Sequence, residues 1–213
     1  MDEEISIINN ETKKEKVLNF LKNNKKKLFL LLIILILIPF SIFSYQIIKD
    51  KNKDKLSSKF NLAVSNYENG NKSEIKSIMK EIINNKDKTY SPLALYFLID
   101  NDIQLTNEEV NNYFDIIINE INLDKEIKNL NIYKKGLFNS SFVSENELLL
   151  ILKPVINSES LWKPHALILL GEYFLAKNQN QKAKEFFNQI LNIENTNEQL
   201  KIEAKKRLIN IGE

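Results

Sequence analysis

The chain has 213 residues, and its 30 lysines and arginines nearly balance its 28 aspartates and glutamates, which leaves a net charge of only +2. This balance argues against a nucleic-acid partner, because nucleic-acid-binding domains concentrate basic side chains on one face. The absence of cysteine excludes disulfides, thiol catalysis and cysteine-bound zinc. A single histidine and four scattered glycines leave little material for a histidine-based catalytic group or a glycine-rich phosphate loop.

The stretch 28–48 contains 21 residues without a charged side chain, between Lys27 and Lys49. A helix of this length is roughly 30 Å long, about the thickness of a bilayer's hydrocarbon core. We therefore predict a transmembrane helix over 28–48, with a kink at Pro39, which lacks an N–H group. A buried core helix and a cleaved signal peptide are the alternatives. Core helices are usually amphipathic, however, and no small-residue cleavage site follows the apolar run.

The predicted span separates a polar tail, residues 1–27, from a larger domain, residues 49–213. The lysines near the span are Lys13, Lys14, Lys16, Lys22, Lys25, Lys26 and Lys27 before it, and Lys49, Lys51, Lys53, Lys55 and Lys59 after it. Basic residues collect on the cytoplasmic side of membrane proteins. We therefore predict a cytoplasmic N-terminus and a domain on the opposite side of the membrane, with the reversed topology as the alternative.

Beyond the span, apolar residues recur at spacings of three and four, and no stretch alternates with period two, so the domain is predicted to be all-α. Expected helices run to about residue 68 and then over 73–83, 91–99, 106–118, 124–137, 144–152, 162–177, 181–192 and 196–209. The signals for their ends are Gly70 as a left-handed terminus, Ser73 and Asp124 as N-caps, and the capping boxes Thr106-x-x-Glu109 and Ser144-x-x-Glu147. Consecutive helices are expected to form hairpins, with the last, strongly charged helix as a cap.

The clearest repeat unit is 164–197, which is 34 residues long. Its packing residues are Leu167, Leu170, Gly171 and Phe174 on a first helix and Ala183 and Phe187 on a second. This is the tetratricopeptide (TPR) pattern, in which small side chains let two helices approach and large ones fill the space beside them. Ala63, Ile75 and Met79 occupy the same offsets in a degenerate early copy. We predict a TPR-like α-solenoid of about four helix pairs after the transmembrane helix.

The stretch 161–192, LWKPHALILLGEYFLAKNQNQKAKEFFNQILN, resembles the last repeat of a family of membrane-anchored bacterial TPR proteins. The family is that of the YfgM-like ancillary subunit of the SecYEG translocon, and the likeness is to its alphaproteobacterial branch. Trp162 and Lys163, then His165-Ala166 and Leu170-Gly171, carry the likeness. It implies a single-pass inner-membrane protein with a periplasmic TPR domain, whose partners are translocon subunits, periplasmic chaperones or secreted chains. A cell-division coordinator shares the domain, so a scaffold in outer-membrane protein assembly or cell-wall synthesis is the alternative.

His165 is the only candidate for general acid–base chemistry, and no nucleophile or metal-ligand constellation accompanies it in the sequence. We therefore predict no catalytic residue, cofactor or metal; a membrane-bound enzyme is the alternative class. In TPR geometry, the helix face that carries His165, Ile168, Glu172 and Leu175 can line a concave groove, which makes these residues the candidate protein-binding site. Trp162 is expected to pack against the following turn as a hydrophobic staple, although interfaces also favour tryptophan.

Overall fold

The computed structural model describes residues 2–68, 70–194 and 196–212, without the side chains of 2–14, 17, 28, 31, 32, 42 and 49. Asn69 of the predicted turn and the side chains of Lys13, Lys14, Leu28 and Lys49 therefore lie outside what is described. The described residues form helices joined by turns and loops, with no strand among them, which confirms the predicted all-α class. Its backbone contacts divide it into two compact units, 1–55 and 56–213.

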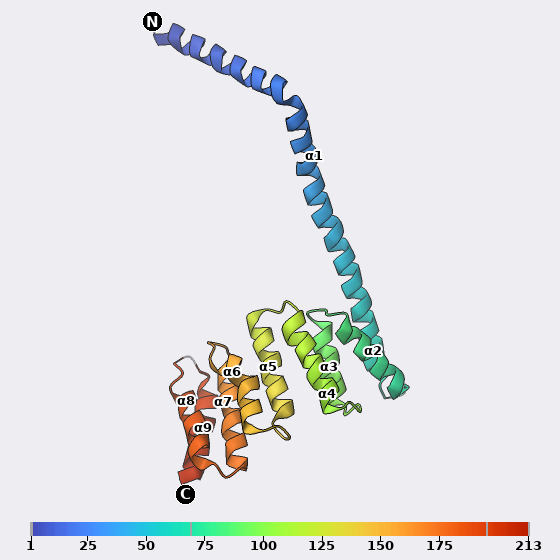
Figure 1. Cartoon of the computed structure of the whole chain (residues 1–213), viewed down its shortest axis with the longest axis vertical. Helices are drawn as coiled ribbons and strands as arrows, with labels where there is room; N and C mark the ends of the chain where they lie inside the picture. The colour runs from blue at the N-terminus through green and yellow to red at the C-terminus, as the bar shows by residue number, and fades with distance from the viewer. Residues whose placement is uncertain (1, 69, 195, 213) are drawn as a thin grey trace. The chain divides into compact units, whose positions relative to one another are not determined.

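The first unit consists of most of helix α1 (Asp2–Ser65), the one helix in the described chain that is long and apolar enough to cross a membrane (Figure 1). Its described apolar side chains, such as Phe29, Leu35 and Phe40, are exposed within the monomer. Exposed apolar side chains all round a helix suit a lipid environment better than a soluble core. Pro39 lies inside α1 without ending it.

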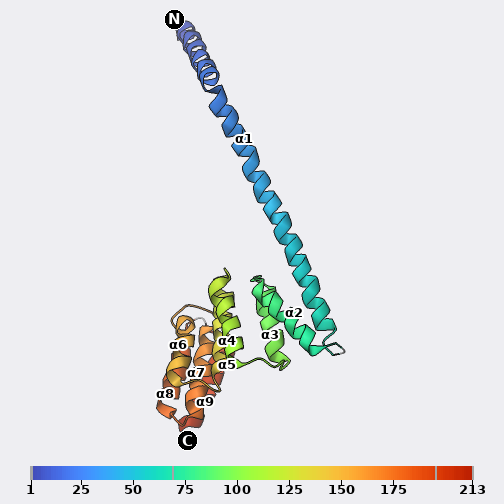
Figure 2. The ribbon, with the colours of Figure 1, turned by 45° about the vertical axis from the view of Figure 1, so that its right-hand side comes forward.

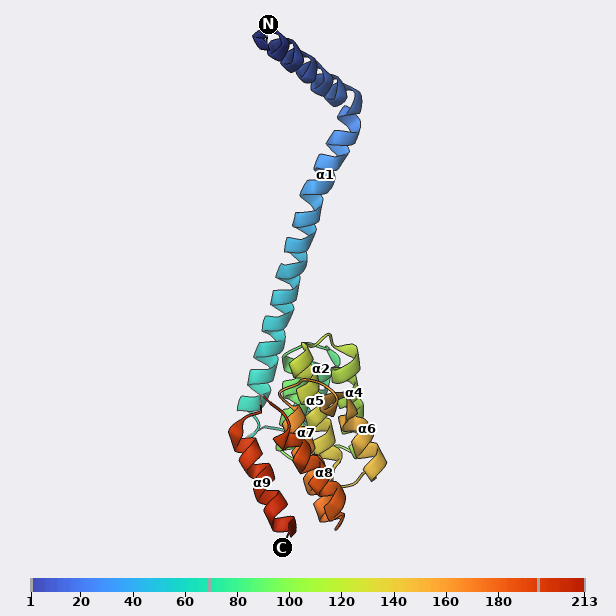
Figure 3. The ribbon, with the colours of Figure 1, turned by 90° about the vertical axis from the view of Figure 1, so that its left-hand side faces the viewer.

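The second unit starts at Leu56, in the last turns of α1, and continues through shorter helices. These are α2 (Lys72–Asn84), α3 (Tyr90–Asp100), α4 (Asn107–Asp115), the π-helical turn η1 (Ile116–Glu120), α5 (Lys125–Asn139), α6 (Glu145–Ile156), α7 (Lys163–Ala176), α8 (Asn180–Leu191) and α9 (Glu198–Gly212). Neighbours along the chain pack on one another, most closely α7 on α8, α2 on α3, α8 on α9 and α5 on α6. Figure 3 shows α9 as the outermost helix of this series.

Two of the helix starts are fixed by the predicted capping boxes, which both form. The Thr106 and Ser144 hydroxyls accept the backbone N–H groups of Glu109 and Glu147 at 3.1 and 3.4 Å. In return, each glutamate accepts the N–H of its cap residue at 3.0 Å. Two N–H groups that have no partner inside the helix are thus satisfied at each start.

Three other predicted helix signals are wrong in detail. Asn71, not Ser73, caps α2, because its side chain reaches the N–H of Ser73 two residues on, at 2.9 Å. Asp124 precedes α5 but makes no side-chain cap bond. Gly70 is not left-handed. A Cβ at Gly70 would lie 2.5 Å from the carbonyl oxygen of Asn66, so glycine serves a close approach there.

The buried faces of the second helix of each pair repeat along the chain. Their members are Ile75, Met79, Ile82 and Ile83 in α2; Val110, Phe114, Ile117 and Ile118 in α4 and η1; Leu148, Leu152 and Val155 in α6; and Ala183, Phe187 and Ile190 in α8. The α2 and α4–η1 sets are 35 positions apart, the α4–η1 and α6 sets are 38 apart, and the α6 and α8 sets are 35 apart. The same helix face is therefore buried four times, at a spacing close to one TPR unit.

How closely two paired helices pack depends on one residue of the first helix. This residue lies sixteen positions before the large side chain at the centre of the second helix. In α7–α8 this residue is Gly171, which faces the Phe187 ring; in α5–α6 it is Gly136, which faces Leu152. In α3–α4 it is Leu98, and these two helices lie further apart. The predicted helices 91–99 and 106–118 therefore pack on one another less closely than the α5–α6 and α7–α8 pairs. Helix α3 instead packs most closely on α2, where the Ser91 hydroxyl donates to the Ile82 carbonyl at 3.0 Å.

Candidate protein-binding surface

The four predicted groove residues, His165, Ile168, Glu172 and Leu175, all lie on α7 and are all half-buried. Helix α7 is flanked by α5 and α9, so part of this face meets neighbouring helices. Glu172 accepts two hydrogen bonds from Arg207 of α9, at 3.2 Å from Nε and 2.6 Å from Nη2. The Glu172 part of the predicted face is therefore tied to α9.

His165 belongs to a cluster of three rings that the sequence did not bring together. The ring centroids of Tyr133, Trp162 and His165 are 5.4 to 5.9 Å apart, and the Tyr133 and Trp162 planes differ by only 20°. Trp162 does not form the predicted staple, because it is itself the N-cap of α7, whereas a staple residue precedes the cap. Its ring instead stacks on Tyr133 of α5, so it joins two consecutive repeat units.

The surroundings of Tyr133 keep its phenol neutral. Burial raises the pKa of the Tyr133 hydroxyl, and the carboxylates of Glu172 and Glu203 raise it further. Arg207 lies between these two carboxylates, at 2.6 Å from Glu172 and 3.5 Å from Glu203. The neutral Tyr133 phenol therefore lies beside a network of one cation and two anions.

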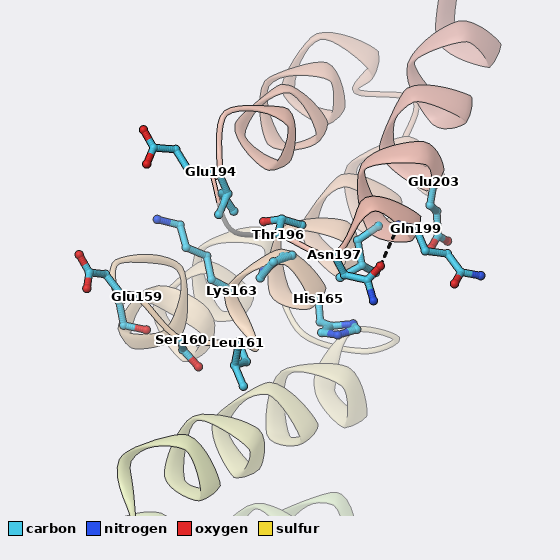
Figure 4. A pocket seen from close by; sticks show the side chains of 14 residues that line it. Glu159, Ser160, Leu161, Lys163, His165, Glu194, Thr196, Asn197, Gln199 and Glu203 are labelled. Atoms are coloured by element: carbon cyan, nitrogen blue, oxygen red, sulfur yellow. Dashed lines mark hydrogen bonds between the residues drawn. The ribbon is translucent and has the colours of Figure 1, made fainter.

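A cavity of about 870 Å³ adjoins the cluster on the side of the α6–α7 and α8–α9 connections. Figure 4 shows His165 from α7 and Glu203 from α9 on its wall, with Lys163 and Thr196 from the two helix entrances. Asn197 closes the start of α9, where its side chain accepts the N–H of Gln199 at 2.8 Å. The cavity is lined by both polar and apolar groups, which suits a polypeptide segment better than a purely apolar ligand.

A carboxylate of α5 binds the loop that forms the rim of this cavity. Glu126 accepts the Ser160 hydroxyl at 2.7 Å and the Leu161 N–H at 3.0 Å. The Leu161 side chain is 76% exposed at the fixed rim. Sequence reasoning missed these residues, because no local pattern links Glu126 to a loop about 35 positions further on.

The predicted packing residues lie behind this surface and support it. All of them are buried: Leu167, Leu170, Gly171, Phe174, Ala183 and Phe187. A Cβ at Gly171 would lie 2.5 Å from the Phe187 ring, so α7 and α8 are in contact at this point without room for a side chain. A binding surface on α7 would therefore rest on a closely packed helix pair.

Within 2–68, 70–194 and 196–212, no group of three or more histidine, aspartate or glutamate side chains is placed to hold a metal ion. The Glu109 carboxylate accepts hydrogen bonds from the Lys80 ammonium and from the Thr106 N–H of its own capping box. The ring neighbours of His165 are Tyr133 and Trp162, which supply stacking area.

Comparisons of the chain with known protein families, with curated proteins and with solved structures find no match. A YfgM-like role is therefore a hypothesis that rests on the residues of 161–192.

Proposed function

We propose that this chain is a non-enzymatic, membrane-anchored TPR-type interaction protein, similar in role to the ancillary subunit of the SecYEG translocon. The observation that carries the proposal is the fourfold repeat of one buried helix face at 35, 38 and 35 positions, behind an apolar N-terminal helix. A chain built in this way presents an extended surface, which is typical of proteins that bind other proteins.

The TPR assignment rests on spacing and on small residues. Gly136 and Gly171 both face a large side chain sixteen positions later, which is the close approach that a TPR helix pair requires. The four pairs are then the end of α1 with α2, α3 with α4 and η1, α5 with α6, and α7 with α8. Helix α9 covers the exposed end of the last pair and presents a charged outer face, as a terminal cap does.

The expected partners follow from the family resemblance and from the charges that flank the apolar helix. They are translocon subunits, periplasmic chaperones or secreted chains, bound by a domain in the periplasm with the N-terminus in the cytoplasm. The excess of lysines before the span supports this orientation. Protection of the 56–213 unit from protease added to spheroplasts would contradict it, since a periplasmic domain is open to digestion.

Photocrosslinking in intact membranes tests the partner class. We would place the photoreactive residue at Leu161, His165 or Leu175 on the candidate surface and at Leu150 as the control, because Leu150 is 67% exposed on α6. Crosslinks to translocon subunits and periplasmic chaperones from the first three positions, and none from Leu150, are the expected result. Crosslinks to cell-wall or outer-membrane assembly proteins would instead support the alternative scaffold role.

A charge substitution then tests the surface itself. Leu175→Glu introduces a carboxylate on the candidate face of α7 and should weaken partner capture, whereas Leu150→Glu on α6 should leave it unchanged. Leu175 is more informative than Glu172, because Glu172→Lys would also break the contact with Arg207 and loosen α9. Equal capture by both variants would place the binding surface elsewhere on the molecule.

A further inference from the structure

The part of α1 that precedes the apolar stretch has two unlike faces over residues 15–24, which we name the amphipathic segment. Consecutive residues of an α-helix are about 100° apart, so Leu18, Phe20 and Leu21 fall within an arc of about 160°. All three side chains are exposed in the described chain. The opposite arc carries only polar and charged residues, which are Glu15, Lys16, Asn19, Lys22 and Asn23. The segment therefore presents an uncovered apolar face and a polar face.

Helix α1 is bent on the N-terminal side of its straight apolar stretch, as Figures 1 and 3 show. Figure 2 shows the same N-terminal part foreshortened, so its axis departs from that of the straight stretch. A local cause lies at Asn24, whose side-chain amide donates to the Phe20 carbonyl at 3.0 Å. This carbonyl is also the helical acceptor for the Asn24 backbone N–H, and such competition loosens and bends helices. A bend lets the segment run along a bilayer surface while the following stretch crosses the bilayer.

Lysines are concentrated at this end of the helix. Residues 15–27 contain five lysines and one glutamate, a net charge of +4, whereas the whole chain carries only +2. Lys16 and Lys22 border the apolar arc on its two sides, each about 40° from its edge. The other three, Lys25, Lys26 and Lys27, directly precede the apolar stretch, and all five are exposed. Lysines at the borders of an apolar face are typical of helices that lie in a membrane interface.

Distances along the helix favour a segment that lies on the bilayer over one that projects into water. The headgroup layer is about 5–8 Å thick on each side of the hydrocarbon core. Lys25 is three positions before Leu28, the first residue of the predicted span, which places it about 5 Å from the core, among the headgroups. Leu18 is ten positions before Leu28, so a straight helix would carry it about 15 Å from the core. Only a segment that runs along the surface keeps its apolar face next to the acyl chains.

We infer that residues 15–24 form an interfacial helix that binds the surface of an anionic bilayer. Leu18, Phe20 and Leu21 insert at the boundary between headgroups and acyl chains, and the flanking lysines bind headgroup phosphates. Lipid is the occupant of this face, because the apolar arc is bordered by cations and is continuous with the predicted span. The inference rests on the proposed membrane anchoring, but it does not depend on the orientation of the span or on the partner of the second unit.

Spin-label accessibility on the full-length chain in lipid nanodiscs tests the interfacial helix. The chain lacks cysteine, so single cysteines can be labelled one at a time. Leu18→Cys and Leu21→Cys report on the apolar face, and Asn19→Cys and Asn23→Cys report on the polar face. Collisions with oxygen report exposure to hydrocarbon, and collisions with a nickel chelate report exposure to water. In bilayers that contain phosphatidylglycerol, we expect labels at 18 and 21 to lose nickel collisions and gain oxygen collisions relative to 19 and 23.

Two further labels give the limits of this scale. Leu35 lies in the predicted span, and Leu150 is exposed on α6. Nickel collisions at Leu18 and Leu21 as frequent as those at Leu150 would overturn the interfacial helix. Dipolar broadening between Leu21 labels of two chains would overturn lipid as the occupant in favour of a second copy. A Leu35 label open to nickel would overturn the membrane anchor, and this inference with it, so the two failures are distinguishable.

A pair of substitutions tests the role of the lysines. Lys25→Gln with Lys26→Gln removes two charges beside the segment, and Lys51→Gln with Lys53→Gln is the matched control on the other side of the span. We expect the first variant to raise nickel collisions of the Leu21 label and the control to leave them unchanged. The same rise is expected for the parent chain in phosphatidylcholine alone. Equal collisions in both variants and in both bilayers would overturn the binding of lysines to anionic headgroups.

Discussion

Replacement of Gly171 by alanine should destabilise the second unit, although alanine is the better helix former. A Cβ at this position would lie 2.5 Å from both Cε1 and Cζ of Phe187 and 3.0 Å from Cδ1. Phe187 is fully buried in α8, so its ring has no free direction in which to move. The added methyl group therefore forces α7 and α8 apart or drives the ring out of its rotamer.

The magnitude follows from two opposing effects. Carbon atoms pack best at about 3.5–4.0 Å, so the ring must move by roughly 1 Å, and overpacking of this kind costs about 1–3 kcal/mol. Alanine returns up to about 1 kcal/mol through its helix propensity. The free energy of unfolding should therefore fall by about 1 kcal/mol in Gly171→Ala.

Urea unfolding of the full-length chain in mild detergent measures this change. Trp162 is the only tryptophan and lies at the start of α7, so its fluorescence reports on the same helix pair. Gly212→Ala is the matched control, because a Cβ there meets no atom within 4 Å. Phe187→Leu removes Cε1 and Cζ, so Gly171→Ala should cost less in that background. Equal stability of the Gly171→Ala and Gly212→Ala variants would refute the close-approach argument.

Three further predictions concern helix ends and ion pairs. Ser144→Ala removes a capping box and should lower the free energy of unfolding by about 1 kcal/mol in the same urea assay. Arg207→Lys cannot reproduce the two-nitrogen contact with Glu172 and should cost about 0.5 kcal/mol; a double-mutant cycle with Glu172→Gln that shows no coupling would contradict this. The Lys80 ammonium holds the pKa of the Glu109 carboxyl below its usual range. The stability from Glu109 is therefore present above the ordinary carboxyl pKa and is lost as pH falls through the lowered value. Urea midpoints measured between pH 7 and 3 should show this loss in the wild type, and Glu109→Gln should abolish that part of it.

Local signals predicted the class and several helix starts correctly, because they depend on residues only three or four positions apart. The capping boxes at Thr106 and Ser144 are examples, since each closes within a single helical turn. The apolar stretch in α1 is visible from composition alone. Ala63, Ile75 and Met79 could also be placed in register with the last repeat, and all three are buried.

Signals of the same kind failed where two residues compete for one local role. Asn71 and Ser73 are both good N-cap residues, and only the path of the chain after α1 decides that Asn71 takes the cap. Glycine also favours a left-handed helix terminus, but at Gly70 it is needed because the Asn66 carbonyl leaves no room for a Cβ. Propensity ranks the candidates at such positions, and the tertiary structure selects among them.

The sequence by itself determined where helices form, which of their faces are apolar and at what interval those faces recur, because these properties arise from neighbouring side chains and helical periodicity. Only the tertiary structure decided which helices pack closely and which surfaces stay open. Trp162 on Tyr133, Arg207 on Glu172 and Leu161 on Glu126 join residues about 30 positions apart or more. The wider spacing of α3 and α4 likewise arises when all the helices compete for packing partners, which a pattern within any one helix does not record.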